Sequence, residues 1–410
     1  MTSQNEERLF GGYAGRMLGS LALAWMVLQT GRFLLSPLLP AMIDSLALTP
    51  ATAGIALGAF QLVYAVTQYP SGRVSDALGR ATVLLPGLAV LLLTFSLLSI
   101  TTTAGLFVCA MICLGIGKGL FASPSRALLS DLFVNRRGRA LGLYAAGTDV
   151  GGLIAAGTAF MVVGGGAAMF ADIGIVPAAE TLTWRSPFIP VALALAAVTL
   201  LYAVWSQEEL AFAANRPSTS VGATVRRLLT TREQREALVA FGLFFFVVGA
   251  WINFLPTYLA EAKGLAAPLP QVLFAVVFAI GMATKPLAGA ASDRVPRRLV
   301  AIGGLLVAVV ALVIVTMVNS PVALALAIAA FAVGYKAQFP IIDAVILDAA
   351  PTDNAGGDIG AARAVFLGVG ALGPTYMGAI ATVANYEIAI GGLAVSLLIA
   401  AGVLAAGRRR

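Results

Sequence analysis

Long apolar runs separated by short polar segments dominate the chain. Each run is about 18 to 25 residues long, which is enough to cross the hydrocarbon core of a bilayer as an α-helix. One set lies near residues 17–42, 51–71, 81–101, 104–128, 140–165 and 186–206, and a second near 237–259, 269–289, 298–318, 321–346, 360–384 and 387–407. The pattern predicts an all-α integral membrane protein with twelve transmembrane helices, six in each set.

A polar segment from Gln207 to Glu236 separates the two sets. It is rich in charge and carries Pro217 followed by three small hydroxyl residues, a composition typical of a solvated linker. We therefore expect an N-terminal six-helix bundle over residues 1–206, a cytoplasmic linker over 207–236 and a C-terminal six-helix bundle over 237–410.

Composition supports this interpretation, because 60% of the residues are hydrophobic and only 11% are charged, whereas about a quarter of a soluble domain is charged. The polar, acidic start of the chain does not resemble a secretory signal, so the first apolar run is expected to be retained. Most of the 26 lysines and arginines fall in segments on one side when both termini are placed in the cytoplasm. These features predict a multi-pass protein of the cell membrane.

The chain contains no histidine and two cysteines. Cys109 and Cys113 lie four residues apart in one apolar run, where packing is the simplest role. Without histidine or a metal-ligand spacing, we expect no metal, no cofactor and no enzymatic activity. Proton chemistry is left to carboxylates, and no feature indicates nucleic-acid binding.

Two charged loops repeat along the chain. The segment GRVSDALGRA begins at Gly72 and GAASDRVPRR begins at Gly289, which corresponds to a shift of 217 residues (289 − 72). The same shift superposes Asp76 on Asp293, Arg80 on Arg297 and Asp131 on Asp348. An offset kept across separate regions predicts two pseudo-symmetric bundles built from a parallel repeat.

These loops, the twelve spans and the central linker together resemble the major facilitator superfamily over essentially the whole chain. The resemblance implies a secondary active transporter that works by alternating access, with spans 1, 4, 7 and 10 around a central cavity. It also implies a latch in which Arg80 pairs with Asp131, and Arg297 with Asp348, on the cytoplasmic side. The alternative is that these charges only set topology; the second loop departs from the pattern because Pro296 stands where the first has Gly79.

Charged residues within the spans are candidate site residues, because a charge in the bilayer is costly unless it faces water or a partner. Counting about 1.5 Å per residue places Arg32, Lys118, Lys336 and Asp149 near the middle of the membrane. Lys285 and Arg363 come out nearer a membrane face. The cations predict contact with an anionic substrate group.

The expected substrate contacts are three cations and three polar or aromatic neighbours on spans 1, 4, 7 and 10: Arg32, Lys118, Lys336, Gln29, Trp25 and Asn253. The alternative is structural pairing, either of Arg32 or Lys118 with Asp149 or of Lys336 with Asp343. A further pairing of Arg126 with Asp343 is predicted as a cytoplasmic gate, since the 217-residue shift superposes these positions.

Asp149 lies in the glycine-rich segment GTDVGG, which is expected to pack closely against neighbouring helices. As the carboxylate nearest the middle, it is our candidate for proton coupling; the alternative is a structural ion pair. The segment is similar to the fifth-span motif of the family's antiporters, although the usual proline is missing.

The sequence therefore predicts a monomeric, proton-coupled carrier of a small anionic or amphipathic organic solute. Two alternatives stay open. One is a proton-coupled efflux antiporter of drugs or metabolites, favoured by the glycines of span 5, and the other is a non-transporting sensor or enzyme.

Overall fold

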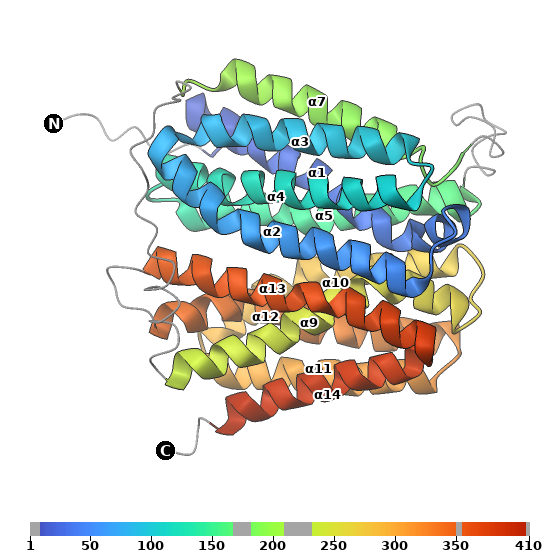
Figure 1. Ribbon diagram of the computed structural model, residues 1–410. Helices are drawn as coiled ribbons and strands as arrows, with labels where there is room; N and C mark the ends of the chain where they lie inside the picture. The colour runs from blue at the N-terminus through green and yellow to red at the C-terminus, as the bar shows by residue number, and fades with distance from the viewer. Residues whose placement is uncertain (1–8, 167–181, 209–231, 350–354, 407–410) are drawn as a thin grey trace.

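The computed structural model describes residues 9–166, 182–208, 232–349 and 355–406, without the side chains of 343, 344 and 346–361. This part of the chain is helical (Figure 1). The first bundle consists of α1 (Gly12–Ser45), α2 (Pro50–Leu78), α3 (Arg80–Ile100), α4 (Ala104–Leu132), α5 (Arg137–Val163) and α7 (Phe188–Trp205). The second consists of α9 (Arg232–Glu261), α10 (Leu269–Ser292), α11 (Arg297–Met317), α12 (Pro321–Ala349), α13 (Ala355–Val383) and α14 (Tyr386–Ala406).

Within the described ranges, 12 helices are long and apolar enough to cross a membrane, as predicted. Large apolar side chains such as Leu193, Leu200 and Val310 are exposed on them. A water-soluble protein would bury such side chains, whereas a bilayer accepts them. The helices also extend beyond the apolar runs. The polar first turn of α9 begins at Arg232, inside the segment 207–236 expected to be linker, because hydropathy does not detect a helical turn outside the membrane.

Helix packing follows the same plan in both bundles. In the first, α1 packs on α5 and α7, α2 packs on α4, and α3 packs on α4 and α7. In the second, α9 packs on α13 and α14, α10 packs on α12, and α11 packs on α12 and α14. Each of these contacts in the first bundle has its counterpart in the second, so the repeat seen in the loops extends to the packing.

The two bundles lie side by side and meet mainly through α2 against α13 and α5 against α10, with α1 against α9 (Figure 1). Helix α1 begins and helix α14 ends at the same end of the molecule, which we call the terminal end; the opposite end is the distal end (Figure 1). Near the distal end, the amide of Ala51 donates a hydrogen bond of 3.1 Å to Thr382 Oγ1.

Glycines allow the close approach of α2 and α13. A Cβ atom on Gly54 would meet the carbonyl of Pro374 and the backbone of Gly378, and a Cβ atom on Gly378 would meet the carbonyl of Pro50. Such backbone contact requires residues without side chains. The bundles therefore pack directly against each other through α2 and α13 near the distal end.

Candidate substrate and coupling site

A buried carboxylate joins the two bundles at mid-depth. Asp149 on α5 is 2% exposed and accepts a hydrogen bond of 2.7 Å from Lys336 Nζ on α12. Its other oxygen, Oδ2, is ion-paired with Lys285 Nζ on α10. One carboxylate of the first bundle thus binds two lysines of the second, in an arrangement we call the Asp149 cluster.

Small residues make room for this cluster. A Cβ atom on Gly281 of α10 would collide with Asp149 Oδ1 and with the side chain of Lys336. On α5, Gly151 lies against the backbone of α1, and Gly152 lies against the ring of Phe278. The expected packing face is therefore present at these positions.

Arg32 on α1 is buried and has a neutral partner. Its Nη2 donates to Oδ1 of Asn253 on α9 at 3.4 Å, while Nη1 has no hydrogen-bond partner among the described residues. The guanidinium carbon lies 4.4 Å from the centre of the Phe33 ring. The structure thus brings together Arg32 and Asn253, both predicted from the sequence, and leaves part of the guanidinium unsatisfied.

Lys118 on α4 is also buried, and its ammonium is surrounded by aromatic rings. Nζ lies 4.6 Å from the ring centre of Tyr64, 5.4 Å from that of Phe60 and 5.7 Å from that of Trp25. Cation–π contact stabilises a lysine but does not neutralise it. Among the described side chains, Lys118 forms no ion pair.

Trp25 and Gln29 lie on the same helix as Arg32. The indole Nε1 of Trp25 donates to Thr148 Oγ1 on α5 at 2.9 Å, which holds the ring beside Lys118. Gln29 is buried, and its Oε1 accepts no hydrogen bond from the described residues. Unsatisfied polar atoms in an apolar interior are costly, so Gln29 and Arg32 mark places where a bound solute would gain hydrogen bonds.

The partners of Asp149 differ from those named in the alternative of structural pairing. Neither Arg32 nor Lys118 pairs with it; Lys336 and Lys285 do. The residue count along the helix predicted that Lys285 lies nearer a membrane face, because such a count gives the depth of the backbone and not that of the ammonium group. A lysine side chain carries its charge at the end of a four-carbon stem, and this reach brings the ammonium of Lys285 to the cluster.

The first charged loop contains the predicted ion pair. Arg80 Nη2 lies 3.1 Å from Asp131 Oδ2 at the end of α4, and Arg80 also pairs with Asp76. Gly72 lies close to Ser123 of α4, whose hydroxyl a Cβ atom at this position would displace. The contacts are present, while their role as a latch stays a prediction.

The second loop is built differently. A Cβ atom on Gly289 would meet no described atom within 4 Å, unlike a Cβ atom on Gly72. The side chains of Asp348 and Asp343 lie outside the described residues, so the pairs with Arg297, Arg126 and Lys336 stay predictions. Arg126 itself stacks over Trp25, with its guanidinium carbon 5.2 Å from the ring centre.

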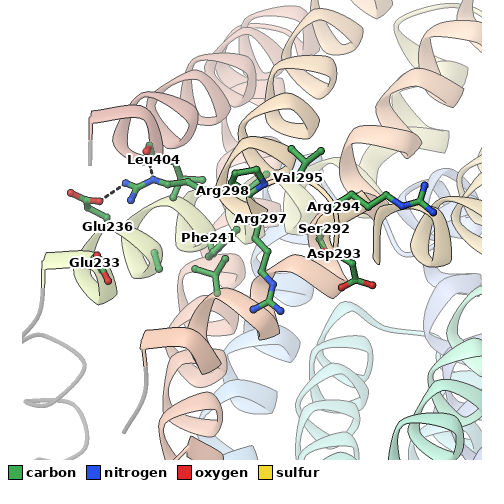
Figure 2. Close-up of a pocket in the computed structure, with 14 residues that line it drawn as sticks. Glu233, Glu236, Phe241, Ser292, Asp293, Arg294, Val295, Arg297, Arg298 and Leu404 are labelled. Atoms are coloured by element: carbon green, nitrogen blue, oxygen red, sulfur yellow. Dashed lines mark hydrogen bonds and ion pairs between the residues drawn. The ribbon is translucent and has the colours of Figure 1, made fainter. Parts of the chain in front are cut away.

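A pocket of about 540 Å³ lies beside this second loop (Figure 2). There, Arg298 donates from Nη2 to Glu236 Oε2 and from Nε to the carbonyl of Leu404. Asp293, Arg294 and several neighbours also line it. The pocket belongs to the terminal end of the second bundle, and its ion pair ties α9 and α11 together.

Two six-helix bundles that share a buried ionic site are the architecture of a membrane solute carrier. The chain belongs to the Major Facilitator Superfamily, whose sequence profile matches residues 21–284 and 239–410.

Similar proteins agree with this assignment. The "Probable sulfoacetate transporter" of Cupriavidus necator is 27% identical over 305 residues, covering 69% of this chain and 65% of the relative. The "Hexuronate transporter" of Bacillus subtilis is 22% identical, covering 68% and 64%. The chain thus spans slightly less than two thirds of the length of these relatives.

A solved structure of a bacterial homologue of the human lysosomal transporter Spinster, inward-facing and unoccupied, has the same fold. Its TM-score is 0.81 at 16% identity, with 96% of this chain and 97% of the other covered. At this identity, the likeness concerns the fold alone.

Proposed function

We propose that the protein carries a small organic anion across the cell membrane by alternating access. The observation that carries this proposal is the pair of buried cations, Arg32 and Lys118, that have no acidic partner among the described side chains. Buried charges without partners are unfavourable in the membrane, so a solute that supplies negative charge would bind there. The names of the sulfoacetate and hexuronate transporters support an anionic cargo.

The proposal also assigns an orientation and a state. Both charged loops lie at the terminal end of the molecule, where α1 begins and α14 ends (Figure 1). Since basic loops stay in the cytoplasm, we assign the terminal end to the cytosol. We also propose that the carrier acts as a monomer.

Uptake into proteoliposomes tests the anion site. Replacement of Arg32 or Lys118 by Gln should lower uptake of an anionic substrate at least about tenfold, because each removes a positive charge from the cavity. Arg232→Gln is the matched control, since Arg232 is 58% exposed and pairs with Glu236 of the next turn. Anion uptake that survives both substitutions, or preference for cationic drugs, would contradict the proposal.

We further propose that Asp149 couples transport to protons. A proton on Asp149 would remove the charge that holds Lys285 and Lys336, and this would loosen a contact between the bundles. Asp149→Asn should therefore abolish uptake driven by a pH gradient, while exchange of labelled for unlabelled solute, measured per amount of folded protein, should stay within about twofold. Glu233→Gln, at the start of α9, is the control, and proton-driven uptake by Asp149→Asn would show that coupling lies elsewhere.

A further inference from the structure

We infer that the preferred cargo is a compact dianion, whose two negative charges are matched to Arg32 and Lys118. This inference rests on the proposed anion transport and makes it more specific. It follows from the way four cations of the site, Arg126 apart, divide into two groups. Lys285 and Lys336 share Asp149, whereas Arg32 and Lys118 have neutral partners among the described side chains.

The two unneutralised cations lie close together. The ring of Phe60 is near both, with its centre 6.0 Å from the guanidinium carbon of Arg32 and 5.4 Å from Nζ of Lys118. The two charged groups are therefore at most 11.4 Å apart, which is the sum of these distances. Ion pairs of about 3 to 4 Å at each end leave at most about 5 Å between the two negative charges of a cargo that lies between these groups.

The described surroundings do not supply the missing negative charge. The rings of Trp25 and Tyr64 present polarisable faces to Lys118, and Asn253 presents a carbonyl oxygen to Arg32. The Asp149 cluster has one carboxylate for two lysines, so it adds repulsion and offers no free anion. Arg126, also stacked on Trp25, adds a further positive charge.

Charge balance then separates monoanions from dianions. A monoanion neutralises one cation and leaves the other buried and unpaired, an arrangement that is strongly unfavourable. A dianion neutralises both in one binding event. A short dicarboxylate, a sulfonated carboxylate and a phosphate monoester share this chemistry.

Matched pairs of solutes test the inference in proteoliposomes at about pH 7.5, where carboxylic acids are ionised. Succinate and butyrate have the same number of carbons and differ by one carboxylate; sulfoacetate and glycerol 3-phosphate represent the other two dianion types. At least one of the three dianions should be taken up about tenfold or more faster than butyrate and acetate. The dianion that is taken up fastest shows which of these three acidic groupings the site prefers.

Variants of Lys118 supply the second readout. Lys118→Gln should lower the ratio of dianion to monoanion uptake about tenfold, because Arg32 alone is neutralised by a monoanion. Lys118→Arg keeps both positive charges and should keep the ratio. Size-exclusion profiles, compared with that of the Arg232→Gln control, show whether each variant is folded.

The outcomes separate the two proposals. Monoanion uptake equal to or faster than that of every dianion would overturn the dianion inference and leave anion transport standing. An unchanged ratio in a folded Lys118→Gln variant would also overturn it. Transport of cations or neutral solutes, with no anion uptake, would refute the proposed function itself.

Discussion

At the scale of single residues, the main feature is how the buried charges are shared. Asp149 satisfies two lysines, and both contacts bridge the bundles. Arg32 and Lys118, by contrast, rely on an amide and on aromatic rings. The same interior therefore contains a neutralising cluster that joins the bundles and a pair of cations that we propose to bind an anion.

Removal of the carboxylate should reveal the cost of unpaired lysines. Asp149→Ala should destabilise the protein by on the order of 3–5 kcal/mol, because Lys336 would stay buried without a counter-charge. The double variant Asp149→Ala with Lys336→Met should recover part of that loss. Thermal unfolding in detergent measures both.

The exposed Asp131 provides the control for this experiment. It is 59% exposed where it pairs with Arg80, and exposed pairs contribute no more than about 1 kcal/mol, so Asp131→Ala should change stability little. A double variant as unstable as Asp149→Ala would contradict the assignment of the penalty to Lys336.

At the scale of helices, glycine positions decide where the bundles touch. Gly54 and Gly378 allow α2 and α13 to meet backbone to backbone, and Gly281 leaves room for the Asp149 cluster. Gly289 lacks the close neighbour among the described atoms that its counterpart Gly72 has. The two charged loops are therefore more alike in sequence than in the packing contacts of their glycines.

A larger residue at the α2 and α13 contact should force these helices apart. Gly54→Leu is expected to destabilise the protein by about 1–3 kcal/mol, the usual range for overpacking, because the atoms it meets are backbone and cannot rotate away. Gly303→Leu is the matched control, since Gly303 is exposed on α11 with open space around its Cβ position. Equal unfolding temperatures of the two variants would contradict the close packing.

At the scale of the whole molecule, the proposed alternating-access cycle has to separate the bundles where α2 packs on α13 near the distal end. The hydrogen bond between Ala51 and Thr382 joins the bundles at the distal end. Transport by the proposed cycle requires this contact to open, because the two bundles rock about a central site.

A reversible cross-link tests that motion. Ala51→Cys with Thr382→Cys, in a Cys109→Ser and Cys113→Ser background, should form a disulfide on oxidation and lower uptake at least about tenfold, with recovery on reduction, because the bond would hold the bundles together. Each single cysteine variant is the control and should keep its uptake on oxidation. Full uptake by the cross-linked protein would exclude opening at this contact.

Local information is sufficient for several features of the site. The depth of Arg32, Lys118, Lys336 and Asp149 follows from their distance along a helix, because the helical rise is constant. The pair of Arg80 and Asp131 follows from the repeated loop and the family it resembles. Asn253 follows from the polar positions of span 7, although the sequence does not show that it meets Arg32.

The sequence by itself determined the number of spans, the division into two related halves and the presence of charge at mid-depth, because hydropathy and repetition are properties of the chain read in order. Only the tertiary structure decided which of the charges at mid-depth pair. Asp149 meets Lys285 and Lys336 across 136 and 187 residues, and this depends on how each helix is rotated, how closely glycines let the helices approach and how far a lysine side chain reaches.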